Sequence, residues 1–531
     1  KTSIIAGRDI RSETREIGSA FDYTHNSNNY YRGADHTEVG TQIQTQGDLT
    51  LSAGQDLSAR AANVTSGGEL AVSVGRDIHL TTGVESHDYA KHTKHTDKGF
   101  LSKSTTETHD ETHDRQAIST TLSANSVRLQ AGNNISVHGS NVAGTQDVSL
   151  VAGNHLDITT VGESHQETHL KKEKKSGLMS SGGIGFTIGS RSQKSTVEGQ
   201  GEKQLGSTLG SQYGNLTLSA GHDTTVHGSD LVAGGDIVLS GRNVNITAAE
   251  NSQTTLQKFE SHQSGLTVAL SGAVGSALNT TVQNVQQARQ TQDGRLQALG
   301  GVKAALSGIQ AAQALDLNNA QQAAQQAGSG EAAPAAFGVT ASLGSQSSKS
   351  EQKTQSHTVS GSSLSAGHDI HIRATGDSQG SDGNILVQGS QAKAAHDIYL
   401  DAQRDIQLLS GLNTETLSGK NSSHGGSVGV GINVGQNTGI TVSASVNTAK
   451  GHENGTTLTH TNTTLDAGHH VTLNAGRDAT LKGVQVSGEK ITADVKRNLT
   501  LQSEQDSDHY DSKQQSASAG ASYTWGAGGP S

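Results

Sequence analysis

Short phrases of alternating apolar and polar residues recur along the chain, separated by turns rich in Gly, Asp and Asn. The phrases "GDLTLSAGQDLSA" (47–59) and "HDIYLDAQRDIQL" (396–408) each place two Asp residues eight positions apart. A longer period of 21 residues links Asp48 to Glu69 and Asn215 to Asp236. Apolar–x–apolar spacing is strand periodicity, while Gly, Asn and Asp favour turns. The pattern therefore predicts short strands with a turn every few residues.

A repeat of 20–21 residues built from such strands predicts an all-β fold, a right-handed parallel β-helix (β-solenoid) in which each coil stacks on the previous one. Five blocks carry coils, at 41–84, 118–162, 208–249, 362–410 and 457–503, and residues 1–40 hold a partial repeat and an excursion. The residues expected to point inward in the third block are Leu216, Leu218, Val226, Leu231, Ile237, Leu239, Val244 and Ile246. The segment 377–383 is a small bulge that restores the register.

Acidic residues recur at the turns and predict a structural ladder in which each carboxylate bonds backbone at its turn, without metal. Its members are Asp56, Asp77, Asp223, Asp236, Asp369, Asp397, Asp405 and Asp478.

Long excursions separate the blocks, at 85–117, 163–207, 250–361, 411–456 and 504–531. They open polar and His-rich, as in "ESHQETHLKKEKK" (163–175), and most then become Gly-rich and alternating, as in "GGIGFTIGS" (182–190). Such alternation predicts β-hairpins with one apolar face. Apolar residues at 3–4 spacing within 276–328 predict one helical insert.

The apolar hairpin faces have two candidate partners. They could dock on a coil flank and cover a sheet edge, which we expect in the isolated protein. They could also contact the lipid of an outer membrane, whose strands alternate with apolar side chains facing outward. Tyr523 and Trp525 repeat the alternation, and the candidate membrane-contact residues are Ile184, Phe186, Ile188, Leu266, Val268, Leu270, Val428, Val430, Ile432, Val434, Ile440 and Val442.

Composition fits a thin core of small aliphatic side chains: Gly is 66 of 531 residues, Pro is 2, and aromatic residues are 3%. The chain has no cysteine, which excludes disulfides, thiolate metal sites and Cys nucleophiles. Its net charge of −11 is spread along the chain and argues against nucleic-acid binding. The first residues already belong to the repeat pattern, so we expect a piece of a longer chain.

The sequence contains only weak signals for a metal site, a calcium site or a catalytic site. His92, His95, His109 and His113 have chelating spacings, but they lie in polar excursions with no third ligand fixed by a scaffold. The phrase "AGGDIVLSG" is similar to a calcium-binding nonapeptide but does not recur in tandem. A polysaccharide lyase or hydrolase would need an acid–base cluster that breaks the ladder. We therefore predict no catalytic, cofactor-binding or metal-ligating residues and no enzyme activity.

Three stretches resemble a known family. They are "GSDLVAGGDIVLSGRNVNITAAE" (228–250), "ESHQETHLKKEKKSGLMSSGGIGFTIGSRSQKS" (163–195) and "VQNVQQARQTQDGRLQALGGVKAALSGIQAAQA" (282–314). They look like the filamentous-haemagglutinin repeat region of two-partner-secreted bacterial exoproteins. The resemblance is closest to the second such region of the CdiA-type contact-dependent growth inhibition toxins.

This resemblance implies a secreted, surface-exposed filament, a monomeric rod, that helps to carry a C-terminal toxin across the outer membrane of a target cell. Its implied partners are an outer-membrane two-partner-secretion transporter during export, and the target-cell outer membrane or its surface proteins. The alternative is the structural shaft of an adhesin that attaches to cells or matrix. A toxin domain downstream would decide between them.

Overall fold

The computed structural model describes residues 1–180, 185–271, 337–434, 439–526 and 529–530. Throughout these residues the secondary structure consists of strands and turns. The predicted helical insert at 276–328 and the candidate residue Ile184 lie outside the described residues. No helix in the described part of the chain is long and apolar enough to cross a membrane.

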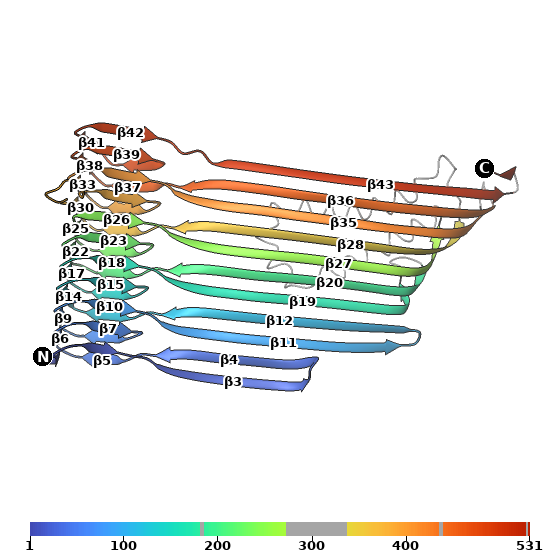
Figure 1. Cartoon of the computed structure of the whole chain (residues 1–531), viewed down its shortest axis with the longest axis horizontal. Helices are drawn as coiled ribbons and strands as arrows, with labels where there is room; N and C mark the ends of the chain where they lie inside the picture. The colour runs from blue at the N-terminus through green and yellow to red at the C-terminus, as the bar shows by residue number, and fades with distance from the viewer. Residues whose placement is uncertain (181–184, 272–336, 435–438, 527–528, 531) are drawn as a thin grey trace.

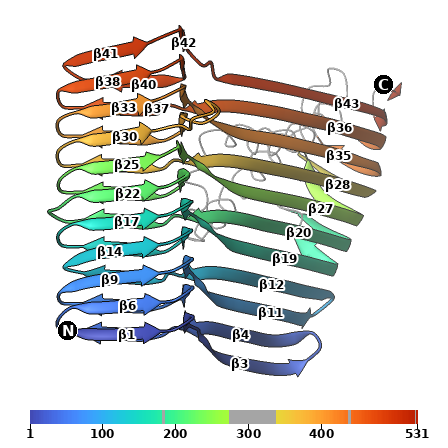
Figure 2. The same ribbon diagram turned by 60° about the vertical axis from the view of Figure 1, so that its left-hand side comes forward.

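The predicted parallel β-helix is confirmed. Three parallel sheets of 11, 11 and 10 strands form the faces of a rod, seen at the left of Figure 1 and again in Figure 2. Equivalent residues of successive coils pair directly, as Val148 does with Leu216 and Leu150 with Leu218. Steps of about 4.8 Å between coils make the stack roughly 50 Å tall.

The first face contains β1 (Thr2–Ala6), β6 (Leu49–Ala53), β9 (Glu69–Val74), β14 (Ser126–Ala131), β17 (Val148–Ala152), β22 (Leu216–Ala220), β25 (Ile237–Gly241), β30 (Ile370–Ala374), β33 (Ile398–Ala402), β38 (His470–Ala475) and β41 (Lys490–Val495). The second contains β2 (Ile10–Ser12), β7 (Leu57–Arg60), β10 (Ile78–Thr81), β15 (Ile135–His138), β18 (Leu156–Thr159), β23 (Asp223–His227), β26 (Asn243–Thr247), β31 (Ile385–Gln388), β34 (Ile406–Leu409), β39 (Asp478–Lys482) and β42 (Asn498–Gln502). The third contains β5 (Gln42–Thr45), β8 (Asn63–Ser66), β13 (Thr121–Ala124), β16 (Asn141–Gly144), β21 (Thr208–Ser211), β24 (Asp230–Ala233), β29 (Ser363–Ala366), β32 (Gln391–Ala394), β37 (Thr463–Ala467) and β40 (Val484–Ser487).

The rod core is a narrow stack of aliphatic side chains. All eight residues predicted to point inward in the third block are at most 1% exposed. Along each strand the buried positions alternate with exposed or half-buried ones, as in β22 and β25. This alternation explains how a chain with few aromatic residues builds a continuous core: every coil adds a few side chains that cover those of the coil before it.

A second structure, which we call the fin, is made of the excursions. It is one 12-stranded sheet in which long hairpins pair with one another in antiparallel register. Figure 1 shows these strands running side by side away from the rod. Its strands are β3 (Arg15–Asn26), β4 (Asn29–Val39), β11 (Gly83–Gly99), β12 (Ser102–Ile118), β19 (Val161–Ser180), β20 (Gly185–Leu205), β27 (Ala249–Ser271), β28 (Phe337–Ser360), β35 (Gly411–Val434), β36 (Gly439–Thr461), β43 (Ser507–Gly526) and β44 (Gly529–Pro530).

The predicted hairpins thus exist, but the expected docking on a coil flank is wrong. A hairpin strand finds its hydrogen-bonding partners in the neighbouring hairpins: β28, for example, lies between β27 and β35. Pairing between hairpins gives interior fin strands such as the 24-residue β28 hydrogen-bonding partners on both edges. Docking a lone hairpin on the rod would leave both of its own edges unpaired.

The hairpins leave the rod from every second coil, always at the corner between the second and third faces. Four intervening coils turn this corner tightly through Gly139, Gly228, Gly389 and Gly483, whose φ angles of +52°, +54°, +57° and +65° favour glycine. A Cβ at Gly228 would also lie 2.6 Å from the Cβ of Ala249. The corner between β7 and β8 instead has Ala61, at a φ of +46°. A residue with positive φ therefore marks each coil that carries no hairpin.

A column of buried hydroxyl groups runs along the same corner. The N–H of Ser207 donates to Ser229 Oγ at 3.1 Å, that of Ser229 to Ser362 Oγ at 3.2 Å, and that of Ser362 to Ser390 Oγ at 3.1 Å. These serines are at most 1% exposed. The column satisfies buried backbone groups where the chain leaves for the fin. The recurring phrases "HGSN", "HGSD" and "QGSQ" (138–141, 227–230 and 388–391) carried this signal, which sequence analysis missed.

The core makes a direct prediction. Leu239 is fully buried, whereas the neighbouring Val238 points to the outside of the same strand. Leu239→Asp should destabilise the chain by several kcal/mol, because it buries a charge without a partner. Val238→Asp should shift the midpoint of urea unfolding far less. Equal shifts for the two variants would contradict the assigned orientation of β25.

Candidate functional site

One side of the outer half of the fin is apolar, and we call it the apolar face. Thirteen large apolar or aromatic side chains on it are each 37–63% exposed. They are Phe186, Ile188, Leu266, Val339, Leu343, Val428, Val430, Ile432, Ile440, Val442, Val446, Tyr523 and Trp525. Soluble proteins seldom expose a contiguous apolar surface of this kind without a partner for it.

Strand register makes the apolar face continuous. One row crosses six strands through residues that pair directly: Phe186, Val268, Ala341, Val430, Val442 and Tyr523. A parallel row, two residues further along, joins Ile188, Leu266, Leu343 and Val428. Because side chains alternate between the two sides of a strand, this register gathers the apolar residues of separate hairpins on one side.

Most of the predicted contact residues lie on this face. Phe186, Ile188, Leu266, Val428, Val430, Ile432, Ile440 and Val442 are exposed there, and Val268 is half-buried in the same row. Leu270 and Val434 belong to β27 and β35. The structure adds Val339 and Leu343, which β28 contributes to the same rows.

The opposite side of the outer fin is polar and small. Hydroxyl pairs join neighbouring strands, from Thr187 to Thr267 at 2.9 Å and from Thr441 to Thr524 at 2.9 Å. Ser443 pairs with Ser522 in the same register. The outer fin is therefore two-sided, apolar on one side and small and polar on the other. On the polar side Ser443 and Ser522 are exposed, whereas Thr187 is buried.

The part of the fin nearer the rod carries histidine–carboxylate contacts instead. His113 Nδ1 lies 2.6 Å from Asp88 Oδ1, and its Nε2 lies 2.8 Å from Glu111 Oε1. His87 contacts Asp35 at 2.7 Å. These carboxylates raise the pKa of His113 and of His87. The pKa values of Glu111 and Asp35 are lowered by their hydrogen bonds from His113 and His87.

A similar pair of contacts follows on the next strands. His169 Nδ1 lies 2.8 Å from Asp110, and His165 contacts Asp114. Hydrogen bonding to these carboxylates raises the pKa of both histidines. Of the histidines noted in the sequence, His92 and His113 contact Glu107 and Asp88 across strands, whereas His95 and His109 contact Asp97 and Glu111 of their own strands. The cross-strand pairs hold neighbouring strands together when the imidazoles are protonated.

The predicted Asp ladder lies at the turns on either side of the first face. The carboxylate of Asp236 accepts the backbone N–H of Asp369 at 3.0 Å. The carboxylate of Asp369 accepts the N–H of Asp397 at 3.0 Å. The carboxylate of Asp397 accepts the N–H of His470 at 2.8 Å. Each carboxylate thus accepts the backbone N–H of the equivalent residue in the next coil. The ladder links coils to one another along the rod.

A second ladder runs at the turn between the first and second faces. Asp56 Oδ1 accepts the N–H of Asp77 at 3.2 Å, and Asp405 that of Asp478 at 3.1 Å. Asp77 accepts from Asn134 at 2.9 Å and Asp478 from Asn498 at 3.2 Å.

Arginines of the adjacent coil reinforce this second ladder. Hydrogen bonds from Arg76 and Arg497 lower the pKa of Asp56 and of Asp478 to about 2. Asp223 differs from the other predicted members, because its carboxylate accepts from the side-chain Nδ2 of Asn243 at 3.0 Å.

Comparison with known proteins shows a match to the family described as "Hemagglutinin repeat", at residues 16–96, 101–265, 188–318 and 343–517. A "tRNA nuclease CdiA" of Escherichia coli (strain STEC_O31) is 43% identical over 88% of this chain and 14% of its own length. A "16S rRNA endonuclease CdiA" of Enterobacter cloacae subsp. cloacae is 48% identical over 93% of this chain and 15% of its own. A "Deoxyribonuclease CdiA" of Dickeya dadantii (strain 3937) is 43% identical over 99% and 16%.

The chain thus spans only 14–16% of the length of these relatives. No solved structure matches it.

The ladder predicts a contrast between two substitutions. Asp236→Ala removes the acceptor for the Asp369 N–H and should lower the free energy of unfolding by about 1 kcal/mol. Asp236→Asn should lower it much less, since Asn215 fills the equivalent place one coil earlier and accepts the N–H of Asp236 itself. Thermal or urea unfolding of the two variants measures the difference. Equal losses would show that the acceptor oxygen is not what stabilises this turn.

The ion pairs near the rod predict a pH dependence. Raised histidine pKa values mean that their contribution is complete below about pH 6.5 and is lost as the pH rises through the raised values. The pKa values of the carboxylates are lowered, so the carboxylates' contribution to stability is present above about pH 4 and is lost as the pH falls. Protection of β11 and β12 from hydrogen exchange, corrected for intrinsic rates, should therefore be greatest between about pH 4 and pH 6.5. His113→Gln should flatten the alkaline side of the profile, and an unchanged profile would contradict the assignment.

Proposed function

Because this chain belongs to the hemagglutinin-repeat family, we propose that it is a non-enzymatic rod-and-fin segment of a secreted bacterial surface protein. It helps to deliver a toxin, carried elsewhere in the longer protein, across the outer membrane of a target cell. The relatives named as nucleases support a toxin-carrying parent, since this chain covers a small part of each of them.

The observation that carries the proposal is the apolar face of the outer fin. Its exposed side chains come from at least five strands and form rows across hairpins that are far apart in the sequence. Lipid is the partner we assign to it. A lipid surface demands apolar area but no specific polar pattern, and it tolerates the variety of Val, Ile, Leu, Phe, Tyr and Trp found here.

The two-sided build of the fin supports this assignment. Apolar side chains alternate with Gly, Ser and Thr along strands such as β35 and β36, as they do in strands that face lipid. Tyr523 and Trp525 lie on the apolar face, and such rings are favoured where lipid meets water. The charged histidine–carboxylate contacts lie on the stretch nearer the rod, where water remains.

The rod then has the role of a rigid support. Repetition of the same Asp or Asn at the same turn is typical of a structural repeat, whereas catalysis needs different groups gathered at one place. Lack of cysteine suits export through a narrow outer-membrane transporter, because a disulfide formed before export would obstruct threading. We therefore place the chain at the bacterial surface, with such a transporter as its partner during secretion.

A paired substitution tests the proposal. Val430→Lys with Ile432→Lys adds two charges to the apolar face, while Ser443→Lys with Ser522→Lys adds the same charges to the polar side. In the toxin-carrying parent protein, the first variant should be secreted and should attach to target cells, but toxin entry should fall by at least about tenfold. The second should deliver toxin at the rate of the unchanged protein.

The readouts are surface display, cell attachment and growth inhibition of target cells. Normal toxin entry by the Val430–Ile432 variant would refute contact with lipid. Loss of attachment with unchanged entry per attached cell would instead favour an adhesive role for the fin.

A further inference from the structure

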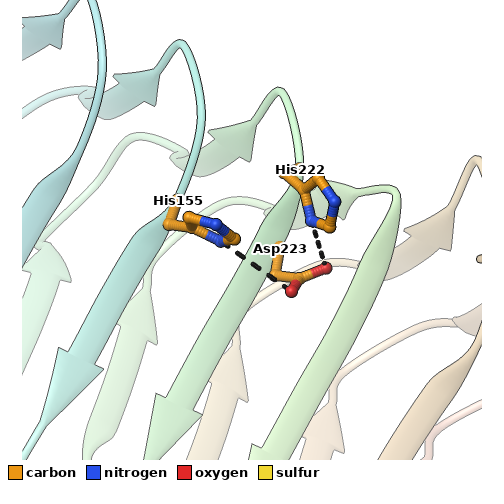
Figure 3. Close-up of side chains that lie close together, drawn as sticks. All are labelled: His155, His222 and Asp223. Atoms are coloured by element: carbon orange, nitrogen blue, oxygen red, sulfur yellow. Dashed lines mark ion pairs between the residues drawn. The ribbon is translucent and has the colours of Figure 1, made fainter.

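A cluster of metal-ligating side chains lies on the rod, away from the apolar face of the fin. His155 follows β17, and His222 and Asp223 come at the equivalent turn of the next coil, between β22 and β23 (Figure 3). His222 Nδ1 lies 3.0 Å and His155 Nδ1 3.8 Å from the Asp223 carboxylate. The two imidazole centroids are 4.9 Å apart. One ligand atom from each residue fits within 4.8 Å of the other two.

The bulge identified in the sequence at 377–383 places a second carboxylate beside the cluster, at the other ring nitrogen of His222. Asp382 Oδ2 lies 3.9 Å from His222 Nε2. The side-chain amide of Asn243 donates to both Asp223 and Asp382, at 3.0 Å each, and so holds the two carboxylates near one another. Arg404 fixes the bulge from outside by donating to the carbonyl oxygens of Gly380 and Ser381, at 3.1 and 2.7 Å.

The cluster departs from the pattern of its own ladder. Elsewhere at this turn an arginine donates to the Asp of the preceding coil: Arg76 to Asp56, and Arg477 to Asp405, each from Nε at 2.8 Å. His222 occupies the place of that arginine, and His155 occupies the place of the Asp or Asn. The positive charge that arginine brings between coils elsewhere is thus replaced here by two imidazoles beside two carboxylates.

We propose that His155, His222 and Asp223 bind one divalent transition-metal ion of the Zn²⁺ class, with water completing its coordination. Imidazole nitrogen and carboxylate oxygen are ligands that Zn²⁺ takes in tetrahedral sites, at about 2.0–2.2 Å. Such a site needs donor atoms roughly 3.3 Å apart, so small side-chain rotations close the distances seen here. The sequence alone predicted no metal-ligating residues, because it did not show that the turn at His155 stacks on the turn at His222 and Asp223.

The site would act as a staple across coils. Its ligands come from the coil of β17 and the next coil, with β22. The hairpin β19–β20 interrupts the chain between these coils. A metal ion bound here would join two coils that a long excursion separates in sequence, in the way that arginine–carboxylate pairs join coils elsewhere on the same edge.

Zn²⁺ titration of the chelator-treated whole chain tests the proposal, with calorimetry for affinity and thermal unfolding for stability. His155→Gln with His222→Gln should abolish one binding event and the accompanying rise in melting temperature. Asp223→Asn should weaken that event by at least about tenfold. Co²⁺ in place of Zn²⁺ should give the visible absorption of a tetrahedral centre in the unchanged chain and lose it in the double variant.

The matched control is His368→Gln with His396→Gln, which alters the other histidine cluster on the rod, where His368 is already hydrogen-bonded to Asp236 at 2.8 Å. This control should keep the binding event, the melting shift and the Co²⁺ spectrum. Binding that survives in the His155–His222 variant would overturn the proposal. Equal losses in both double variants would also overturn it, since they would show general association of the ion with surface histidines.

Discussion

The spacing between β-strands is the constraint on which the architecture depends. Neighbouring strands lie about 4.8 Å apart, whether they belong to stacked coils or to paired hairpins. A hairpin contributes two strands, so it needs the height of two coils. One hairpin in every second coil, at a fixed corner, therefore gives a fin that rises in step with the rod. Hairpins from every coil would be too crowded to lie in one sheet, and wider intervals would leave edges unpaired.

Two sets of interactions keep the coils of the rod and the strands of the fin in register. On the rod, Asp and Asn side chains bond the backbone of the next coil, and buried hydroxyls do the same at the corner where the hairpins leave. On the fin, direct pairing aligns the apolar residues of separate hairpins in rows, such as that of Val268 and Val430. The apolar face therefore depends on the register of the fin strands, which the stacking of the coils in the rod sets. No single hairpin provides it.

Much of this architecture could be predicted from the sequence, because it depends on local alternation. The coil repeat, the inward residues such as Leu239 and the hairpin between β35 and β36 all follow from period-two patterns and turn residues. Pairing between hairpins could not be predicted, since it joins segments such as β12 and β19 that whole coils separate. For the same reason the sequence did not show that Asp236 bonds the next coil or that Asp382 lies near His222.

In the proposed delivery role, the apolar face of the fin meets lipid while the side that carries Ser443 stays in water. The chain has no cysteine, so a single cysteine can carry an environment-sensitive fluorophore at one chosen position. Labels at Val430 and at Ser443, on opposite sides of adjacent strands, should be compared on vesicles of outer-membrane lipids. We expect a blue shift and protection from an aqueous quencher at residue 430 and little change at residue 443. Equal quenching at both positions, with no blue shift at 430, would contradict it.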